Sequence, residues 1–251
     1  MTLPIQVLSP LDGRYQAVVS PLGEYLSEAG LNRARVTVEV EWLIYLTNHS
    51  MFGTSPLSAD NVAALRALVT DFGQAEIDEL ARLEATTRHD VKAVEYLVRA
   101  KLSELGLDHI AELTHFACTS EDINNLSYAL IVRDATKNIW LPALQAVIAR
   151  LRELSVQYRD EAMLAKTHGQ PATPTTMGKE LAVFVYRLER IQKQIEGSEY
   201  LGKFSGATGT FSAHLAAEPE ANWPTISEEF VTSLGLTWNP LTTQIESHDW
   251  Q

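Results

Sequence analysis

The sequence is poor in cysteine and has no long apolar run. Its single cysteine, Cys118, cannot form an internal disulfide and is typical of a reducing compartment. The longest notable apolar run covers residues 181–186, far short of the roughly 18 residues that a membrane-spanning helix requires. The N-terminus lacks the basic stretch and apolar centre of a signal peptide. These absences predict a cytoplasmic protein with no membrane partner.

Positive charge is also scarce, because 20 basic residues face 32 acidic ones and leave a net charge of −12. Such a surface repels phosphodiester polymers and anionic lipids, which predicts no nucleic acid polymer as a partner. A small anionic substrate is still compatible, since a few arginines and helix ends can create a locally positive pocket. With 45% hydrophobic and 21% charged residues, the 251-residue chain has the composition of a globular protein with one large or two modest domains.

Helical periodicity dominates between residues 57 and 197. Apolar residues recur at spacings of three and four within 62–72, 91–105, 141–154 and 177–195. The last two stripes are long enough to be rods of a helical bundle, and no sustained strand pattern separates them. Irregular structure is expected at 1–30, 165–176 and 202–225, where glycine, threonine and proline are frequent in the last two.

One segment is ambiguous. Residues 36–42 alternate apolar and polar side chains and are rich in valine, which is typical of a strand. Val36, Val40 and Leu43 nevertheless lie on one face of a helix with the same sequence. The pattern alone leaves both possibilities open.

Two polar segments in the first half of the chain are candidates for a functional site. After the turn at Asp12, Arg14 stands beside Tyr15, a combination that can clamp an anion. Taken alone, this segment is more typical of a surface turn with one solvated arginine. Further on, Thr87 and the aspartate three residues later fit a capping box. That box would place His89 in the first helical turn, where the positive helix end keeps imidazole neutral. The alternative is a surface histidine beside a cap.

Two later segments are denser in polar residues. Thr119 or Ser120 can cap a helix through Asp122, leaving backbone N–H groups free to hold a carboxylate or phosphate. Cys118, just before them, is more typical of a small buried apolar residue. His168 lies between a threonine and a glycine on a segment stiffened by prolines, which suits a general acid or base. An incidental histidine on a structural loop is the alternative there.

Several common chemistries find no support in the sequence. The glycine-rich stretch 202–210 has neither the phosphate-loop spacing nor the dinucleotide fingerprint. His109 and His115 do not have the spacing of metal ligands on a helix, and no Gly-x-Ser-x-Gly elbow occurs. Metal, nucleotide-hydrolysis and serine-hydrolase functions are therefore not predicted.

The polar segments together resemble the adenylosuccinate lyases, a family of the fumarase/aspartase superfamily. The stretches that match are Leu-Asp-Gly-Arg-Tyr at 11–15, Arg-His-Asp-Val-Lys-Ala-Val-Glu at 88–95, Thr-Ser-Glu-Asp-Ile-Asn-Asn at 119–125, Thr-His-Gly-Gln-Pro-Ala-Thr-Pro-Thr at 167–175 and Thr-Gln-Ile-Glu at 243–246. Each stretch is moderately specific, but the five in this order are very specific, and they span most of the chain.

The resemblance implies an all-α fold with a long-helix bundle that assembles into a homotetramer. It implies that residues 36–47 are helical, that a small N-terminal helical domain covers 1–108, and that the central bundle begins within 109–251. The implied reaction needs no cofactor and no metal. It is a β-elimination that releases fumarate from adenylosuccinate, giving AMP, and from the succinylated carboxamide ribotide SAICAR, giving AICAR.

The resemblance also implies roles for individual residues. His168 corresponds to the general acid that protonates the leaving nitrogen. The substrate contacts that it implies are Arg14 and Tyr15 for the phosphate, Arg88, His89 and Asp90 along a binding strip, Thr119 and Ser120 for the fumaryl carboxylates, and Gln244. Arg88 occupies a position that varies within the family.

One family feature is absent from the sequence. The general base of the family is a serine on a mobile loop with the signature Gly-Ser-Ser-x-Met-Pro-x-Lys-x-Asn-Pro, and no stretch of this chain matches it. The chain stops where the central helices of the family should continue, so we expect a fragment that is inactive or nearly so by itself. Two other functions compete with this interpretation. One is a sister lyase that acts on argininosuccinate, fumarate or aspartate, and the other is a non-catalytic helical interaction module.

Overall fold

The computed structural model describes residues 9–250, and over that range the fold is predominantly helical, which confirms the predicted all-α class. The helices of the described range are α1 (Gln16–Leu26), α2 (Glu28–Asn48), α3 (Ala59–Thr70), α4 (Gln74–Thr87), α5 (Asp90–Glu104), α6 (Ser120–Ala135), α7 (Leu141–Gln157), α8 (Met177–Glu196), α9 (Ser212–Ala217) and α10 (Trp223–Ser233). Short 3₁₀ turns lie at η1 (Met51–Gly53) and η2 (Asp108–Leu113), and η3 (Thr136–Trp140) is a π-helical turn. None of the helices in 9–250 is both long and apolar enough to cross a membrane.

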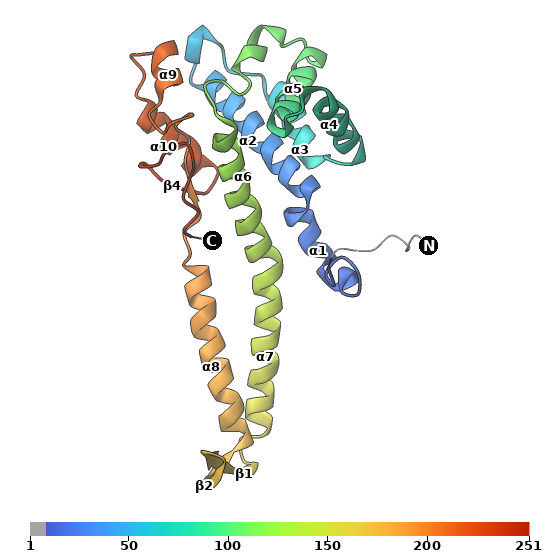
Figure 1. Ribbon diagram of the computed structural model, residues 1–251, viewed down its shortest axis with the longest axis vertical. Coiled ribbons are helices and arrows are strands. Elements are labelled where there is room, and N and C mark those ends of the chain that lie inside the picture. Colours follow the sequence, from blue (N-terminus) through green and yellow to red (C-terminus); the bar gives the residue numbers. More distant parts are fainter. Residues whose placement is uncertain (1–8, 251) are drawn as a thin grey trace. The chain divides into compact units, whose positions relative to one another are not determined.

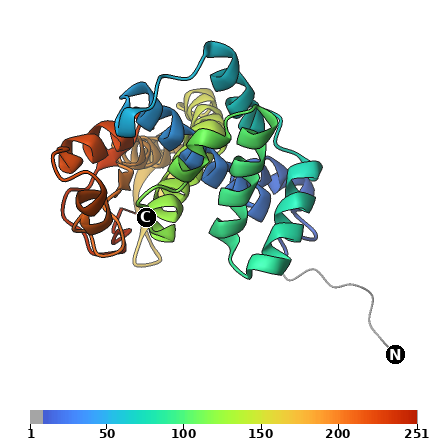
Figure 2. The same cartoon turned by 90° about the horizontal axis from the view of Figure 1, so that it is seen from above.

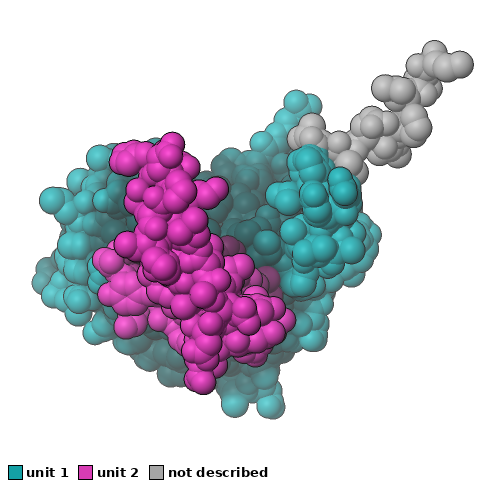
Figure 3. All heavy atoms as spheres, turned by 90° about the horizontal axis from the view of Figure 1, so that it is seen from below, with its two compact units in different colours: residues 1–133, 199–251 teal, residues 134–198 magenta. Residues whose placement is uncertain are grey.

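The chain divides into two compact units, coloured separately in Figure 3. Unit 1 contains residues 1–133 and 199–251, and unit 2 contains residues 134–198. The family resemblance implied a domain boundary near residue 108. That boundary divides the fold of the whole family protein, and it stays a prediction.

Helix α2 forms the centre of unit 1, and its burial resolves the ambiguous pattern of residues 36–42. Val36, Val38 and Trp42 are all completely buried. In a helix, residues two positions apart, such as Val36 and Val38, lie on different faces, so more than one face of α2 is covered. Only a narrow edge, which includes Thr37, Glu41 and Tyr45 at a spacing of four, is partly exposed along this stretch. A helix that is buried on nearly all sides carries no clean apolar stripe. The segment therefore resembles a strand in sequence while being helical, as the family resemblance implied.

The rest of unit 1 packs around α2 and α6. In Figures 1 and 2 the C-terminal segment with α9 and α10 lies on one side of these two helices, and α4 with α5 lies on the other. Phe204 and Phe230 bring the C-terminal segment against Trp42, with ring centroids 4.5 and 4.9 Å from the indole. A short parallel pair, β3 (Leu201–Gly202) with β4 (Thr237–Trp238), closes this segment. Residues far apart in sequence thus meet beside the start of α6.

Unit 2 consists mainly of α7, α8 and the hairpin that joins them (Figure 1). The hairpin pairs β1 (Ala162–Thr167) antiparallel with β2 (Gln170–Thr176), so the expectation of irregular structure at 165–176 is wrong. Its loop is the dipeptide His168-Gly169, and both residues have positive φ angles, 49° and 74°. Two central residues with positive φ form the turn type that matches the twist of a tight hairpin. Most residues of both strands are exposed, so no alternating apolar pattern marked them in the sequence.

The other two segments expected to be irregular are partly helical. Helix α1 and the beginning of α2 lie within 1–30, of which residues 1–8 are outside the described range. Helix α9 and the beginning of α10 lie within 202–225. Pro21 lies inside α1, whereas Pro224 lies in the first turn of α10, where its missing N–H costs no helical hydrogen bond. In 202–225, proline was thus a misleading guide to the absence of a helix.

The helix predicted from the apolar stripe at 177–195 is confirmed as α8, but the apolar side chains of the stripe are only partly buried. Val185 and Gly178 are the buried residues of the helix. Phe184 and Ile191, both in the predicted stripe, keep 55% and 47% of their surface exposed. One face of unit 2 therefore retains large apolar side chains at its surface.

The close approach of α7 and α8 depends on Gly178, which supplies the first prediction. A Cβ atom at this position would overlap the carbonyl oxygen of Ser155 and lie 2.6 Å from the amide nitrogen of Arg159. We expect Gly178→Ala to lower the free energy of unfolding of unit 2 by about 2 kcal/mol, because backbone atoms must move apart. Chemical denaturation followed by circular dichroism measures the change.

The matched control is Gly23→Ala in α1, where a Cβ would meet nothing within 4 Å. Alanine in an open helical position should stabilise by about 0.5–1 kcal/mol. Equal effects of the two substitutions would show that the contact at Gly178 is not limiting.

Candidate functional site

The N-terminus of α6 is the point where most of the predicted site residues of unit 1 meet. Thr119 precedes the helix, and its N–H donates to Oδ2 of Asp122 at 2.8 Å. This is one half of a capping box, with the carboxylate of the third helical residue accepting from the capping residue. The predicted capping of this helix through Asp122 is therefore confirmed. Thr119 and Ser120 are both half-buried residues at the same helix end.

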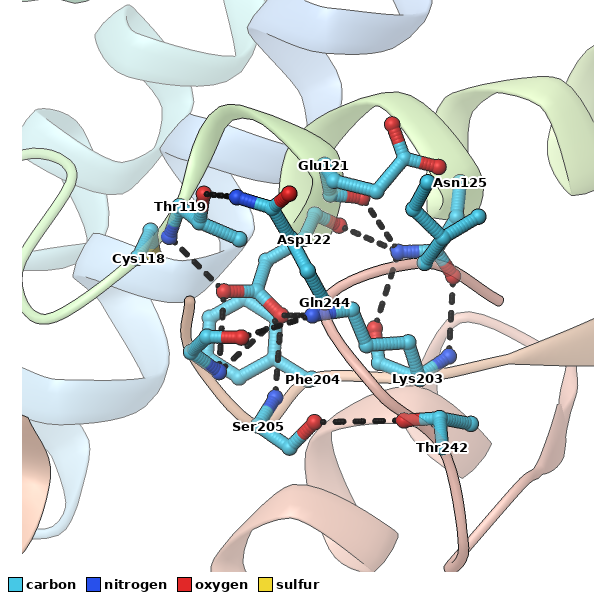
Figure 4. Close-up of polar contacts among 12 residues, drawn as sticks. Cys118, Thr119, Glu121, Asp122, Asn125, Lys203, Phe204, Ser205, Thr242 and Gln244 are labelled. Carbon is cyan, nitrogen blue, oxygen red and sulfur yellow. Dashed lines mark hydrogen bonds and ion pairs between the residues drawn. The ribbon is translucent and has the colours of Figure 1, made fainter. Parts of the chain in front are cut away.

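Asp122 is itself completely buried and accepts several further hydrogen bonds (Figure 4). The N–H groups of Ser205 and Gly206 donate to its carboxylate at 2.9 and 3.1 Å. The ammonium group of Lys203, also completely buried, lies 2.8 Å from Oδ1. The loop after β3 is thereby attached to the first turn of α6 by the same carboxylate that caps the helix.

His89 reaches this helix end from the start of α5. The residue is the N-cap of α5, with Nδ1 accepting from the N–H of Lys92 at 3.3 Å. Its Nε2 lies 3.3 Å from the hydroxyl oxygen of Ser120. Because Nδ1 acts as an acceptor, neutral imidazole carries its proton on Nε2 and can donate it to that hydroxyl. The pair brings α5 and α6 together at the predicted site.

The capping box expected between Thr87 and Asp90 is wrong. Thr87 ends α4, and its hydroxyl instead donates to the carbonyl oxygen of His89 at 3.0 Å. Arg88 intervenes in the left-handed conformation, with φ of 52°, and breaks the helical path between the two. The imidazole therefore caps the helix itself rather than lying in its first turn.

Asp90 is held by an arginine from α2. Arg35 donates to Oδ2 of Asp90 at 2.7 Å and to Oδ1 of Asn124 at 2.9 Å. Burial alone would raise the pKa of Asp90, but the charge and hydrogen bond of Arg35, with the N–H of Val91, lower it overall. The arginine thus ties the starts of α5 and α6 to α2, and it fixes the spacing between His89 and Ser120.

Gln244 arrives from the C-terminal segment of unit 1. Its side-chain amide donates to the Thr119 hydroxyl at 3.4 Å, across 125 positions of sequence (Figure 4). Nearby, Glu246 is completely buried and accepts from the indole N–H of Trp250 at 3.0 Å and from the N–H of His248 at 2.7 Å. These bonds anchor the segment that presents Gln244. The structure therefore brings together the predicted residues His89, Thr119, Ser120 and Gln244.

Other predicted site residues are not part of this cluster. Arg14 and Tyr15 are exposed at the start of α1, where the guanidinium lies 5.5 Å from the centroid of the phenol ring. Arg88 is exposed between α4 and α5. His168 belongs to unit 2, where it is exposed at the tip of the β1–β2 hairpin.

Three buried polar features around the site were not found from the sequence. Lys203 was passed over because lysine is normally a surface residue. Glu39 on α2, completely buried, accepts from the N–H of His115 at 3.0 Å and contacts its Nδ1 at 2.6 Å. Burial lowers the pKa of His115, but the hydrogen bond and charge of Glu39 outweigh it and raise the pKa overall. Glutamates spaced within an apolar helix were the available signal for such pairs.

The third feature is His214, which lies beside Gly206 with 1% of its surface exposed. Within the described part of the chain, neither of its ring nitrogens has a hydrogen-bond partner. Trp223 and Phe211 surround it, with ring centroids 4.9 and 5.6 Å away. Burial lowers the pKa of His214 to about 4, although the negative charge of Asp122 opposes the shift.

The cluster has the chemistry of an anion-binding site. It offers two hydroxyl groups, an imidazole, a side-chain amide and the N-terminus of a helix, all of which stabilise carboxylate or phosphate oxygens. Within residues 9–250, no group of three or more histidine, cysteine, aspartate or glutamate side chains could hold a metal ion.

The sequence matches the lyase family over residues 13–250. It is similar to the adenylosuccinate lyase of Escherichia coli, with 49% identity over 248 residues that cover 98% of this chain and 54% of the relative. The adenylosuccinate lyase of Haemophilus influenzae is 48% identical over the same shares of the two chains. The structure of a fumarate lyase from Mesorhizobium sp. BNC1 has a similar fold, with a TM-score of 0.71 and 20% identity over 89% of this chain and 49% of that chain. The chain spans about half the length of the curated relatives it matches.

The buried imidazole of His214 predicts how stability depends on pH. The imidazole of His214 has a pKa of 6.5 in the unfolded chain, and burial lowers this pKa to about 4 in the folded chain. The stability is therefore fully present above pH 6.5 and is lost as the pH falls toward 4, by about 3 kcal/mol in total. Urea denaturation at a series of pH values measures this loss.

His214→Leu should remove most of the pH dependence in this window, whereas His109→Leu, at an exposed position, should leave it intact. His115 does not confound the test, because its raised pKa makes its contribution constant below 6.5. A slope that persists in His214→Leu would exclude His214 as its source.

Proposed function

The chain belongs to the lyase family, and we propose that it carries the substrate-binding surface and the general acid of an adenylosuccinate lyase. The proposed reaction is a β-elimination. A base removes a proton from the carbon beside a carboxylate, the carbanion is held as an aci-carboxylate, and an acid protonates the nitrogen as the C–N bond breaks. Adenylosuccinate would give AMP and fumarate, and SAICAR would give AICAR and fumarate.

The observation that carries the proposal is the convergence of His89, Thr119, Ser120 and Gln244 at the start of α6. The fumaryl part of either substrate has two carboxylates, and an aci-carboxylate intermediate concentrates negative charge on one of them. Hydroxyl and backbone N–H donors that are already aligned stabilise such charge without reorganising. We assign this role to Thr119 and Ser120, with Gln244 and His89 bordering the same position.

We propose His168 as the general acid. Its place in a two-residue turn leaves the imidazole exposed while the paired strands hold the backbone in one conformation. Histidine is suited to proton transfer near neutral pH, and a fixed backbone limits the positions that the ring can occupy. In the superfamily that the chain resembles, sites are shared between copies, so the substrate of one copy can receive its proton from another.

The phosphate end of the substrate is assigned to Arg14 and Tyr15, with Arg88, His89 and Asp90 along the connecting strip. An arginine fork next to a phenol supplies several donors to one phosphate. Asp90 would act through Arg35, which occupies one of its oxygens, rather than by contacting an anion. No cofactor is proposed, because proton transfers and fixed donors suffice for this elimination.

A second copy of the chain is the proposed partner, in a homotetramer of the complete enzyme. Phe184, Ile191 and Tyr186 of α8 have between 47% and 64% of their surface exposed on a helix of regular geometry. Apolar area of this kind is stabilised by burial against another protein surface. The cytoplasm is the proposed compartment, in keeping with the free thiol of Cys118. With its net charge of −12, no nucleic acid polymer is proposed as a ligand.

The substrate assignment predicts selective binding. Calorimetric titration of the 251-residue chain should give binding of adenylosuccinate and no measurable binding of argininosuccinate, which has no phosphate for Arg14 to contact. Ser120→Ala should weaken adenylosuccinate binding about tenfold, the effect of losing one hydrogen bond to a charged group. The control Ser103→Ala, at an exposed position of α5, should leave the affinity unchanged.

Three results would contradict the assignment. Equal affinity for both ligands would favour a sister lyase, and binding of neither would favour a non-catalytic module. An unchanged nucleotide affinity in Arg14→Ala would remove the phosphate role of that residue.

Because the serine-bearing signature is absent from these 251 residues, we expect no fumarate release from the chain alone. Fumarate release by the 251-residue chain would show that one of its own residues acts as the general base.

The partner assignment predicts association through α8. Sedimentation velocity should show the unaltered chain as a multimer, and the double variant Phe184→Glu with Ile191→Glu should be monomeric because two charges cannot be buried there without partners. Gln194→Glu, also exposed on α8, should leave association intact. A monomeric unaltered chain, or a multimer that survives both charges, would exclude this face as the contact.

A further inference from the structure

Lys203 is the one lysine of the described chain that is completely buried, and it lies outside every predicted site. Its ammonium group is 2.8 Å from Oδ1 of Asp122 and donates to the carbonyl oxygen of Gly206 at 2.9 Å. Its backbone is also held, because its N–H donates to Oδ1 of Asn125 at 2.8 Å and its carbonyl oxygen accepts from the same amide at 3.0 Å. The residue is therefore fastened to the first two turns of α6 at both ends.

A buried ion pair of this kind is poorly explained by stability alone. Moving two charges out of water costs several kcal/mol, and apolar residues of similar volume are often at least as stabilising. What the pair adds is geometry. Lys203 places its ammonium group against the buried carboxylate of Asp122, and this carboxylate accepts from the N–H groups of Thr119, Ser205 and Gly206 at once.

The consequence reaches the hydroxyl groups at the helix end. The bond from Thr119 to Asp122 fixes the backbone just before α6, and this backbone determines where the hydroxyls of Thr119 and Ser120 lie. Those hydroxyls contact Gln244 and His89 respectively. Figure 4 shows Lys203 and Asp122 in contact beside the first turn of α6, with Thr119 at the start of the same turn.

We propose that Lys203 is a positioning residue, which holds the Thr119 and Ser120 hydroxyls in place through Asp122 for the carboxylates of the substrate. The ligand part of this inference rests on the proposed function, whereas the positioning part does not. Lys203 does not contact substrate and takes no part in proton transfer. Its effect is on one end of the substrate, since the phosphate contacts proposed at Arg14 and Tyr15 lie in the turn just before α1.

The experiment compares two ligands in three variants of the full chain. Lys203→Met removes the charge at nearly constant volume, and Lys203→Met with Asp122→Asn removes both charges, so it is available should the single variant not fold. Ser227→Ala is the control, because Ser227 is 1% exposed and donates to the carbonyl oxygen of the adjacent Phe204 at 2.6 Å without contacting Asp122. Affinities for adenylosuccinate and for AMP are measured by calorimetry on each.

Loss of the ion pair should weaken adenylosuccinate binding about tenfold or more in both Lys203 variants, because misplaced donors lose charge-assisted hydrogen bonds. AMP lacks the succinyl carboxylates, so its affinity should stay within about twofold. Ser227→Ala should lower the melting temperature and leave the ratio of the two affinities unchanged. Parallel losses for both ligands, an unchanged ratio in the Lys203 variants, or the same change in Ser227→Ala would each overturn the proposal.

Hydrogen–deuterium exchange of the peptide covering 117–123 separates this inference from the proposed function. The Thr119 N–H should exchange at least about tenfold faster in the Lys203 variants, because its acceptor is displaced, and at the original rate in Ser227→Ala. Should the unaltered chain bind neither ligand, the proposed function fails, and the exchange rates alone decide the positioning role. Unchanged exchange in the Lys203 variants overturns it.

Discussion

The buried carboxylate of Asp122 is the constraint on which the candidate site depends. A carboxylate without water must be surrounded by donors, and here the donors come from three backbone N–H groups and one ammonium group. Satisfying this one group determines how the loop after β3, the cap of α6 and, through Thr119, the side chain of Gln244 are arranged. The candidate site is therefore assembled around a carboxylate that the protein encloses completely.

Helix α2 extends the same principle to the other side of the site. Because the helix is buried on nearly every side, its charged residues Arg35 and Glu39 are enclosed and must find partners on neighbouring segments. Arg35 pairs with Asp90 beside His89, and Glu39 pairs with His115 just before the cap of α6. His115 has a φ of 58°, and the two bonds to Glu39 hold it in that uncommon conformation. A central helix thus supports the loops on both sides of Ser120.

Local patterns in the sequence predict the helices well and the contacts poorly. The stripes at 91–105 and 141–154 correspond to α5 and α7 because one face of each helix packs and the other does not. The β1–β2 hairpin was missed, since both strands are largely exposed and carry prolines. For the site, the resemblance selected Thr119 and Gln244 separately. Only the fold shows that the side-chain amide nitrogen of Gln244 lies 3.4 Å from the hydroxyl oxygen of Thr119. Lys203 could not be found, because nothing local distinguishes a buried lysine from a solvated one.

The turn at His168 has an implication for how this sequence could change over time. A non-glycine residue with φ of 49° carries a conformational cost of about 1 kcal/mol, which glycine would avoid and asparagine would reduce. Selection of variants for thermal stability alone would therefore be expected to replace His168 with glycine or asparagine among the first substitutions. Under the proposed role of His168 as general acid, histidine at the tip lowers stability in exchange for proton transfer, and the cost falls on two residues of an exposed hairpin.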